Sequence, residues 1–288
     1  MHEAIHSMMI GYRCATIADY NNALRDIFQR LALLGLWRSK FFEHAAFYGG
    51  TALRMLYGLD RFSEDLDFSL LRSSHSFSMK AYGDALRKEI DSFGFEVEFE
   101  SSESSRAGQI ESAFLKTNTY RQLITIDAGK ELLSGFHNGK LLKIKLEVDI
   151  NPPGGFETNT QYILQPIPFP VRAYDLPDLF AGKLHAVLCR KWHTRVKGRD
   201  WYDMVWYAGH YPEVNLSHLE VRMKQSGDYS ERDKLTISKL QDLLLEAIDE
   251  LNIDLARKDV SRFIRDPRAL DVWSKDFFQH VINCIKPI

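Results

Sequence analysis

The segment from Tyr48 to Phe68 holds two features that together could do chemistry on a nucleotide. It opens with Gly49-Gly50-Thr51 and closes with Asp65-Leu66-Asp67. A glycine-rich turn that leads into a helix presents free backbone N–H groups to a phosphate. Two aspartates one residue apart on a strand point to the same side, because the side chains of a strand alternate. Joined by one short helix, the two features predict a metal–nucleotide site.

Asp65 and Asp67 are the first predicted ligands of Mg²⁺. Carboxylates that cannot spread apart repel each other, and a divalent cation relieves that cost. Mg²⁺ prefers oxygen ligands and commonly bridges one or two carboxylates to the phosphates of a substrate. A third acid on a neighbouring strand would complete a two-metal arrangement, which activates an attacking hydroxyl and stabilises a pyrophosphate leaving group.

The strand expected at 141–150 offers two candidates for the third acid. Its apolar residues alternate strictly with polar ones, so Lys145, Glu147 and Asp149 share a face. Such a face is often only solvated, but the first two acids lack a third partner. The sequence does not choose between Glu147 and Asp149, so both are predicted metal ligands. Lys145 is counted with the nucleotide-binding residues.

Further residues of the first segment are expected to bind the phosphates of a nucleotide. Gly50 lets the backbone come close to a triphosphate, and the Thr51 hydroxyl and N–H can hold a β- or γ-phosphate oxygen. Arg61 and Ser63 stand just before the acids and are placed with this group. A plain tight turn would explain Gly49-Gly50 alone, and an exposed strand end would explain the two acids alone. Their joint occurrence favours the nucleotide site.

A second charged cluster lies at 183–203. Five cations stand within ten residues, a density that suits a triphosphate or RNA: Arg190, Lys191, Arg195, Lys197 and Arg199. Lys183 lies upstream, on a helix expected to start near Asp175. Asp200 and Asp203 are three apart on the next helix, hence on one face, where one could orient Arg199 or Lys183 or act as a base. A solvated basic loop with Asp200 at a helix N-terminus is the simpler alternative.

The periodicity of the chain predicts the elements that position these residues. Helices are expected at 16–36, 39–46, 51–57 and 78–94, and strands at 65–71, 95–100, 110–118, 120–127 and 141–150, with one edge strand within 160–174. From Asp175 the chain reads as mainly helical. The predicted domains are therefore 1–174, with the N-terminal helices, and a helical domain at 175–288 that contributes Lys183, Asp200 and Asp203 to the site.

Composition excludes several other classes. The 288 residues are 45% apolar, enough for a core, and the formal net charge of 37 − 39 = −2 gives no general affinity for polyanions. Three widely spaced cysteines fit a reducing compartment. No signal peptide or membrane span is expected, which predicts a cytoplasmic protein with no membrane partner. The sequence has no nucleophile elbow, P-loop, Rossmann fingerprint or histidine pair for a metal.

The motifs as a set resemble a known family. GGTALRMLYGLDRFSEDLDF is similar to the first motif of nucleotidyltransferase toxins of the AbiEii/AbiGii type, in the polymerase-β-like nucleotidyltransferase superfamily. Here threonine follows the glycines, and the spacer before the acids is on the long side. KLEVDINPPGGF, DLFAGKLHAVLCR and VKGRDWYDMVW resemble the later blocks, so the likeness runs from about Tyr48 to Tyr207.

The resemblance implies an α+β nucleotidyltransferase core with a mixed sheet and a helical C-terminal part. It implies Mg²⁺ and an NTP donor, with Asp65 and Asp67 as metal ligands and Thr51 as a donor-phosphate contact. Lys183 would match the family's catalytic lysine, and Asp200 and Asp203 its late acidic motif. Members act as toxins of type IV toxin–antitoxin systems with a separately encoded antitoxin, and some transfer nucleotides to the 3′ end of tRNA.

Several functions remain open at this stage. Mg²⁺-dependent transfer of NMP from an NTP to an acceptor hydroxyl, with release of pyrophosphate, is the main hypothesis. The acceptor could be tRNA, a protein or a small molecule, as in antibiotic nucleotidyltransferases. A non-catalytic nucleotide- or RNA-binding protein and a DxD glycosyltransferase are the alternatives from other classes.

Overall fold

The computed structural model describes residues 2–102, 109–118, 141–190, 196–230, 232 and 234–288. The chain divides into two compact units. The first unit comprises Met1–Ala52, Glu64–Pro152 and Thr160–Ala173, and the second comprises Leu53–Ser63, Pro153–Asn159 and Tyr174–Ile288. The main division falls between Ala173 and Tyr174, and the second unit also takes up two short segments from the N-terminal half.

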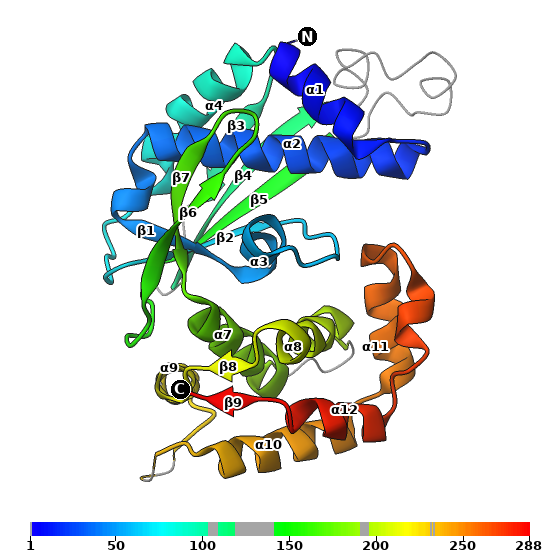
Figure 1. The fold of residues 1–288 in the computed structure, drawn as a ribbon. Helices are drawn as coiled ribbons and strands as arrows, with labels where there is room; N and C mark the ends of the chain where they lie inside the picture. Colours follow the sequence, from blue (N-terminus) through cyan, green and yellow to red (C-terminus); the bar gives the residue numbers. More distant parts are fainter. Residues whose placement is uncertain (1, 103–108, 119–140, 191–195, 231, 233) are drawn as a thin grey trace. The chain divides into compact units, whose positions relative to one another are not determined.

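The first unit is built on a mixed sheet (Figure 1), which has seven strands among the described residues, in the order β3-β4-β5-β2-β1-β7-β6. Its parallel pairs are β1 with β7 and β2 with β5, while β1 with β2, β3 with β4 and β4 with β5 are antiparallel. The strands are β1 (Ala45–Tyr48), β2 (Leu66–Leu70), β3 (Glu98–Ser102), β4 (Ile110–Asn118), β5 (Leu141–Asp149), β6 (Thr158–Ile163) and β7 (Phe169–Tyr174). The predicted α+β fold with a mixed sheet is confirmed.

Helix α2 (Ile17–Arg38) supplies much of the first unit's core. It begins with a capping box in which the Thr16 side chain accepts the Asp19 N–H and the Asp19 carboxylate accepts the Thr16 N–H. Its predicted apolar face is fully buried: Leu24, Ile27, Phe28, Leu31 and Leu34. Helix α2 packs against β5, α4 (Gly83–Ser92) and α1 (Glu3–Tyr12). Figure 1 shows these three helices together on one side of the sheet.

Two predicted elements of the first unit are wrong. Residues 39–46 were expected to form a helix, but they hold a 3₁₀ turn (Phe41–Glu43) and the start of β1. Pairing with β2 buries Ala45 and Ala46 completely, and this gain outweighs the helix propensity of alanine. Within 160–174 two strands form instead of one, and only β6 lies at an edge. The strand expected at 120–127 lies outside the described residues.

The second unit is mainly helical, as expected beyond Asp175 (Figure 1). Its helices are α7 (Leu176–Cys189), α8 (Gly198–His210), α9 (Leu216–Ser226), α10 (Ile237–Glu250), α11 (Ile253–Val260) and α12 (Lys275–Ile282). Short strands β8 (Glu213–Val214) and β9 (Lys286–Pro287), which the sequence did not predict, pair in parallel. Helix α3 (Gly49–Tyr57) begins in the first unit and ends in the second, and Gly58 follows it with φ +84°.

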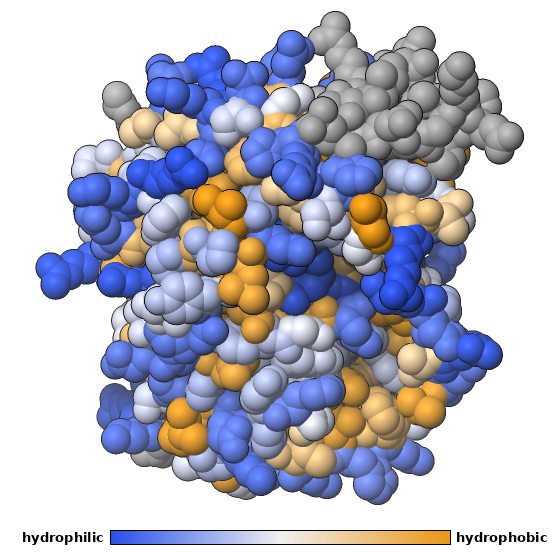
Figure 2. Space-filling view, turned by 45° about the horizontal axis from the view of Figure 1, so that its top comes forward, coloured by the Kyte–Doolittle hydropathy of each residue, from blue (hydrophilic) through white to orange (hydrophobic). Residues whose placement is uncertain are grey.

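The face of the molecule in Figure 2 intermixes hydrophilic residues with scattered hydrophobic ones. The exposed large apolar side chains include Ile10, Val272 and, two residues apart, Tyr162 and Leu164. Single exposed apolar residues are normal on protein surfaces. Among the helices that the structure describes, none combines the length and apolar character needed to cross a bilayer.

Candidate active site

The turn at Gly49 lies directly against the carboxylate of Asp67. Strand β1 ends at Tyr48, which is paired with Asp67 of β2, and α3 begins at the next residue. Gly49 has φ +79°, and a Cβ added to it would come within 2.3 Å of Asp67 Oδ2. Glycine is therefore needed at this position both for its backbone conformation and for lack of space. The fold brings the predicted phosphate-binding turn and the predicted metal ligand into contact.

A second acid stands beside Asp67 on the neighbouring strand. Glu147 of β5 is the registered partner of Asp67, and Ser112 of β4 is the registered partner of Glu147. Registered residues of adjacent strands point to the same face, about 5 Å apart. Asp67, Glu147 and Ser112 therefore form a polar row across the sheet, next to Tyr48 on β1.

The register distinguishes the two candidates for the third acid. Asp149 is paired with Ser69, two residues further along each strand than the pair of Asp67 and Glu147. The Asp149 carboxylate also accepts the N–H of Asn151 at 3.0 Å, a contact typical of a turn that follows a strand. The register thus places Glu147, and not Asp149, directly beside Asp67.

Lys145 and Thr51 use their side chains within the first unit. The ammonium of Lys145 donates to Glu147 Oε1 at 2.5 Å, from the same face of β5. The hydroxyl of Thr51 donates to the carbonyl oxygen of Asp65 at 2.5 Å. This bond connects α3 to the residue before β2. A phosphate contact from Thr51 would therefore use its backbone N–H, which belongs to the first turn of α3.

Four predicted site residues form a buried ionic network in the second unit: Arg61, Lys183, Asp200 and Asp203. Arg61 donates to both carboxylate oxygens of Asp203, at 2.5 Å from Nε and 2.6 Å from Nη2. Lys183 Nζ lies 2.7 Å from Asp203 Oδ2 and 3.5 Å from Asp200 Oδ1. The side chains of Arg61 and Asp203 are 3% and 0% exposed. Bidentate arginine–carboxylate pairs of this kind fix geometry as well as charge.

The network keeps Asp203 ionised. Burial alone would raise the pKa of Asp203, but the charges and hydrogen bonds of Arg61 and Lys183 outweigh it and lower that pKa below its usual value. A carboxylate held in this way is a poor proton acceptor. Its geometry suits the orientation of Lys183, one of the two roles that the sequence left open.

Asp200 and the basic cluster border this network. Asp200 is 5% exposed, and among the described residues its Oδ2 has no hydrogen-bond partner, with Arg190 Nη1 3.5 Å away. Burial, followed by the charge of Arg190, lowers the pKa of Lys197, and Arg199 and Lys183 add to the effect. The described cations therefore stand close to one another. Lys191 and Arg195 lie outside the described residues.

The contacts of the remaining predicted residues in the second unit do not indicate a role in the site. The Arg199 guanidinium stacks over the Phe263 ring at 4.2 Å from its centroid. Ser63 is half-buried at the end of the segment 53–63. Phosphate contacts from Arg61, Ser63 and Arg199 stay predictions. Trp201 and Trp206 are buried, so they act as packing residues of the second unit.

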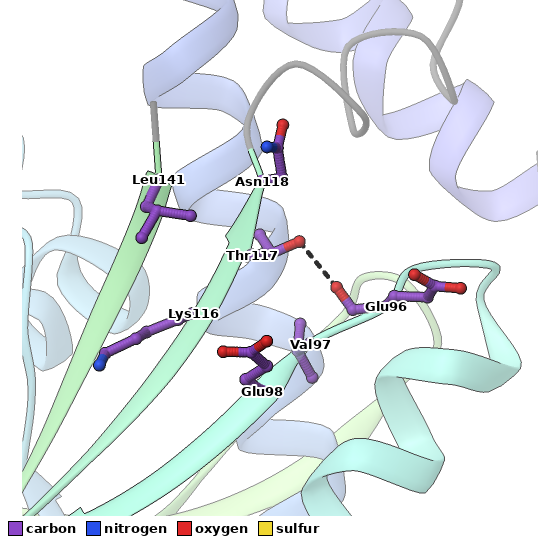
Figure 3. Close-up of a pocket in the computed structure, with 7 residues that line it drawn as sticks. All are labelled: Glu96, Val97, Glu98, Lys116, Thr117, Asn118 and Leu141. Atoms are coloured by element: carbon purple, nitrogen blue, oxygen red, sulfur yellow. Dashed lines mark hydrogen bonds between the residues drawn. The ribbon is translucent and has the colours of Figure 1, made fainter. Parts of the chain in front are cut away.

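A hollow of about 480 Å³ lies at the far end of β5 from Glu147. Glu96, Val97, Glu98, Lys116, Thr117, Asn118 and Leu141 line it. Figure 3 shows Thr117 donating its hydroxyl hydrogen to the Glu96 carbonyl, at 2.7 Å. Leu141 is six residues from Glu147, which is about 20 Å along a strand. The hollow is therefore separate from the acid row.

The pairing of Arg61 with Asp203 and the row through Ser112 were missed by the sequence analysis. Arg61 and Asp203 are 142 residues apart. No local pattern links such residues, so only the tertiary structure reveals the pair.

Comparison with known proteins gives the fold and then the family. JHP933 from Helicobacter pylori has a similar structure, with TM-score 0.53 and 17% identity over 91% of this chain and 90% of that one. A candidate nucleotidyltransferase from H. pylori matches with TM-score 0.45 and 20% identity over 90% of this chain and 92% of that one. None of the curated proteins matches this sequence. Residues 31–278 match the family model described as nucleotidyl transferase AbiEii toxin, type IV TA system, so the chain belongs to this family of nucleotidyltransferase toxins.

Proposed function

We propose that this nucleotidyltransferase transfers NMP from an NTP to a hydroxyl of RNA, in a reaction that depends on Mg²⁺. The observation that supports this most directly is the contact of the Gly49 turn with Asp67, together with the register of Asp67 and Glu147. A phosphate-binding turn and a pair of carboxylates then face the same small region of the first unit. In the reaction the acceptor oxygen bonds to the α-phosphorus, the bond to the pyrophosphate oxygen breaks, and the hydroxyl proton passes to solvent.

Asp65 and the two acids of the row, Asp67 and Glu147, are suited to hold Mg²⁺. Asp65, Asp67 and Glu147 offer carboxylate oxygens, the ligands that this cation prefers, and two of the three are registered on adjacent strands. Bound Mg²⁺ would neutralise charge on the phosphates and lower the pKa of the acceptor hydroxyl. Lys145 now balances the charge of Glu147. Once another cation does so, Lys145 is free to bind a phosphate oxygen.

The second unit carries cations whose chemistry suits the phosphates of an NTP. Asp203 aligns Lys183, so that the ammonium is held in one place instead of sampling many rotamers. The loop that carries Arg61 leads to Asp65 within four residues of sequence. We propose that Lys183 binds the triphosphate and that the cluster around Lys197 binds the acceptor. Closely spaced cations favour a polyanion such as RNA, and the 3′ end of tRNA is the first candidate.

Incubation of the full chain with each α-labelled NTP, total RNA and cell extract tests this function. Label is expected in the RNA fraction, with Mg²⁺ and not with EDTA. Asp67→Asn should lower transfer at least about 100-fold, since several kcal/mol of charge stabilisation are lost. Asp84→Asn is the matched control, because Asp84 is 91% exposed and lies outside the row.

The outcomes separate the parts of the proposal. Label in the protein or small-molecule fraction would show that the acceptor is not RNA, while the proposal of nucleotidyl transfer would stand. Equal transfer by Asp67→Asn and the wild type would remove the acid row from the mechanism. Calorimetry that shows NTP binding without any effect of Mg²⁺, and no transfer, would favour a binding protein.

The family places this chain with toxins of toxin–antitoxin systems, and an antitoxin is the partner we propose. Co-expression with the product of the adjacent gene tests this. The two readouts are the growth of the host and the nucleotide transfer activity. Growth arrest that Asp67→Asn abolishes would connect toxicity to the acid row. Growth arrest by both the wild type and Asp67→Asn would show that toxicity does not depend on the acid row.

A further inference from the structure

A group of metal-ligating side chains lies in the second unit, apart from the ionic network of Arg61 and Asp203. One ligand atom each from His185, Cys189 and Asp228 lie within 4.8 Å of one another. His185 and Cys189 are half-buried and Asp228 is exposed, so solvent ions can reach the group. The nucleotidyltransferase chemistry proposed above uses none of the three.

The backbone holds the three residues in place. His185 and Cys189 are four apart on α7, so they stand one above the other on the same face of the helix. Asp228 follows the left-handed Gly227 (φ +79°) at the end of α9, and its N–H donates to the carbonyl of Met223 at 2.9 Å. Helices α7 and α9 pack against each other. The cluster therefore joins a helix face to a capped helix end.

Hydrogen bonds assign the proton on the imidazole of His185. Ser226 donates its hydroxyl hydrogen to the carbonyl of Met223 at 3.1 Å. The Ser226 hydroxyl has no second hydrogen to donate. Its oxygen therefore accepts a hydrogen bond from His185 Nε2, which lies 3.0 Å away. His185 carries its hydrogen on Nε2 and keeps a lone pair on Nδ1. A metal-binding histidine usually donates its other N–H to a neighbouring oxygen, as here.

The charges of the proposed ligands themselves fit a divalent cation, against the positive charge of Arg222 and Arg190 nearby. A cysteine thiolate and an aspartate carry two negative charges, which match the charge of the ion. Burial, followed by Arg222 and Arg190, lowers the pKa of His185 to about 4, against the effect of Asp228.

We propose that His185, Cys189 and Asp228 form a binding site for a divalent transition metal, with zinc as the ion that this set of nitrogen, sulfur and oxygen ligands matches. Ligand atoms around tetrahedral zinc lie roughly 3.5 Å apart. A group within 4.8 Å reaches that spacing by small side-chain rotations. Three protein ligands leave a fourth position for water. Lys183 stands on α7 two residues before His185, so a metal here would also stiffen the helix that carries it.

Metal titration of the full chain, stripped of metal beforehand, tests the proposal. Equilibrium dialysis with elemental analysis should find one zinc per chain in the wild type. Cobalt substitution should give the near-ultraviolet absorption of a thiolate bound to Co²⁺, a signal that requires no mutant. Cys189→Ser and His185→Gln should each weaken binding at least about 10-fold, and Cys189→Ser should also abolish the thiolate absorption.

The controls use the other cysteines and the acid row. Cys284→Ser and Cys14→Ser should leave both signals unchanged, because these residues lie outside the cluster. Asp67→Asn should also keep the zinc, which separates this site from the proposed Mg²⁺ site. Far-ultraviolet circular dichroism verifies that each variant is folded. No thiolate absorption in the cobalt-loaded wild type, or the same loss in Cys284→Ser as in Cys189→Ser, would overturn the proposal.

Discussion

Single residues decide how the proposed site is built, and Gly49 is the clearest case. It must adopt a left-handed conformation, and it must leave room for the Asp67 carboxylate. Gly58 shares the first requirement, with φ +84°, but a Cβ there would have nothing within 4 Å. The two glycines allow backbone strain to be separated from the contact with Asp67.

Gly49→Ala should lower nucleotide transfer at least about 10-fold, because the added methyl group displaces the Asp67 carboxylate. Gly58→Ala pays only the left-handed strain, about 1–2 kcal/mol of unfolding free energy, and should keep transfer nearly unchanged. Labelled NTP assays and urea unfolding on both variants measure the two effects. Equal losses of transfer would mean that strain, and not the contact with Asp67, is responsible.

Arg61 and Asp203 are a second residue-scale feature with a measurable consequence. Arg61→Ala should lower the free energy of unfolding by about 3–5 kcal/mol, because it leaves a buried carboxylate without its bidentate partner. Arg87→Ala, whose side chain is 55% exposed and pairs with an Asp84 that is 91% exposed, should change it by less than about 0.5 kcal/mol. Urea unfolding measures both. A loss of NTP affinity with unchanged stability would instead assign Arg61 to the phosphates.

At the scale of elements, helix α8 matters most, since it carries Asp200 and Asp203. Its first residue, Gly198, lies so close to α11 that a Cβ there would come within 1.9 Å of the Ala256 carbonyl oxygen. Near the other end of α8, Gly209 has open space, with nothing within 4 Å of an added Cβ. Contact with α11 thus fixes the start of α8. The same contact fixes the position of Asp200 and Asp203, which follow Gly198 on this helix.

Opposite effects are therefore expected from the same substitution at the two ends of α8. Gly198→Ala should destabilise the protein by about 1–3 kcal/mol, because backbone must move to admit the methyl group. Gly209→Ala should stabilise it by up to about 1 kcal/mol through helix propensity. Thermal and urea unfolding test the pair. Stabilisation by both substitutions would show that α8 does not need its close approach to α11.

For the whole molecule, buried histidines couple folding to pH. His218 is fully buried near the rings of Phe156 and Tyr174, and its Nδ1 lies 3.0 Å from the carbonyl of Gly154. Burial, followed by the charge of Arg222, lowers the pKa of His218 to about 4. In the unfolded chain a histidine titrates near pH 6.5.

The free energy of unfolding should therefore fall as the pH drops from about 6.5 to 4, because the unfolded chain takes up a proton that folded His218 refuses. From the shift of His218, the loss amounts to about 3 kcal/mol, and it is absent above pH 6.5. His218→Gln, which can still donate to Gly154, should reduce this slope, while the exposed His75→Gln should keep it. Urea unfolding at pH 7.5 and 4.5 decides, and identical slopes in the wild type and His218→Gln would contradict the assignment.

Local patterns in the sequence predicted much of this protein. The alternation of 141–150, the apolar face of 16–36 and the glycine stop after 51–57 act over a few residues, and β5, α2 and α3 form there. The helix expected at 39–46 does not form, because pairing with β2 outweighs the helix propensity of alanine. Short apolar segments such as this one do not reveal their partner strand.

The sequence by itself determined the family, the mixed α+β fold and the residues worth testing, because motifs and periodicity are local properties of the chain. Only the tertiary structure decided that Glu147 and not Asp149 stands beside Asp67, and that Arg61 binds Asp203. It also brought Asp228 to His185 and Cys189. Strand register and contacts between distant segments depend on packing across the whole chain, and no short stretch of sequence contains that information.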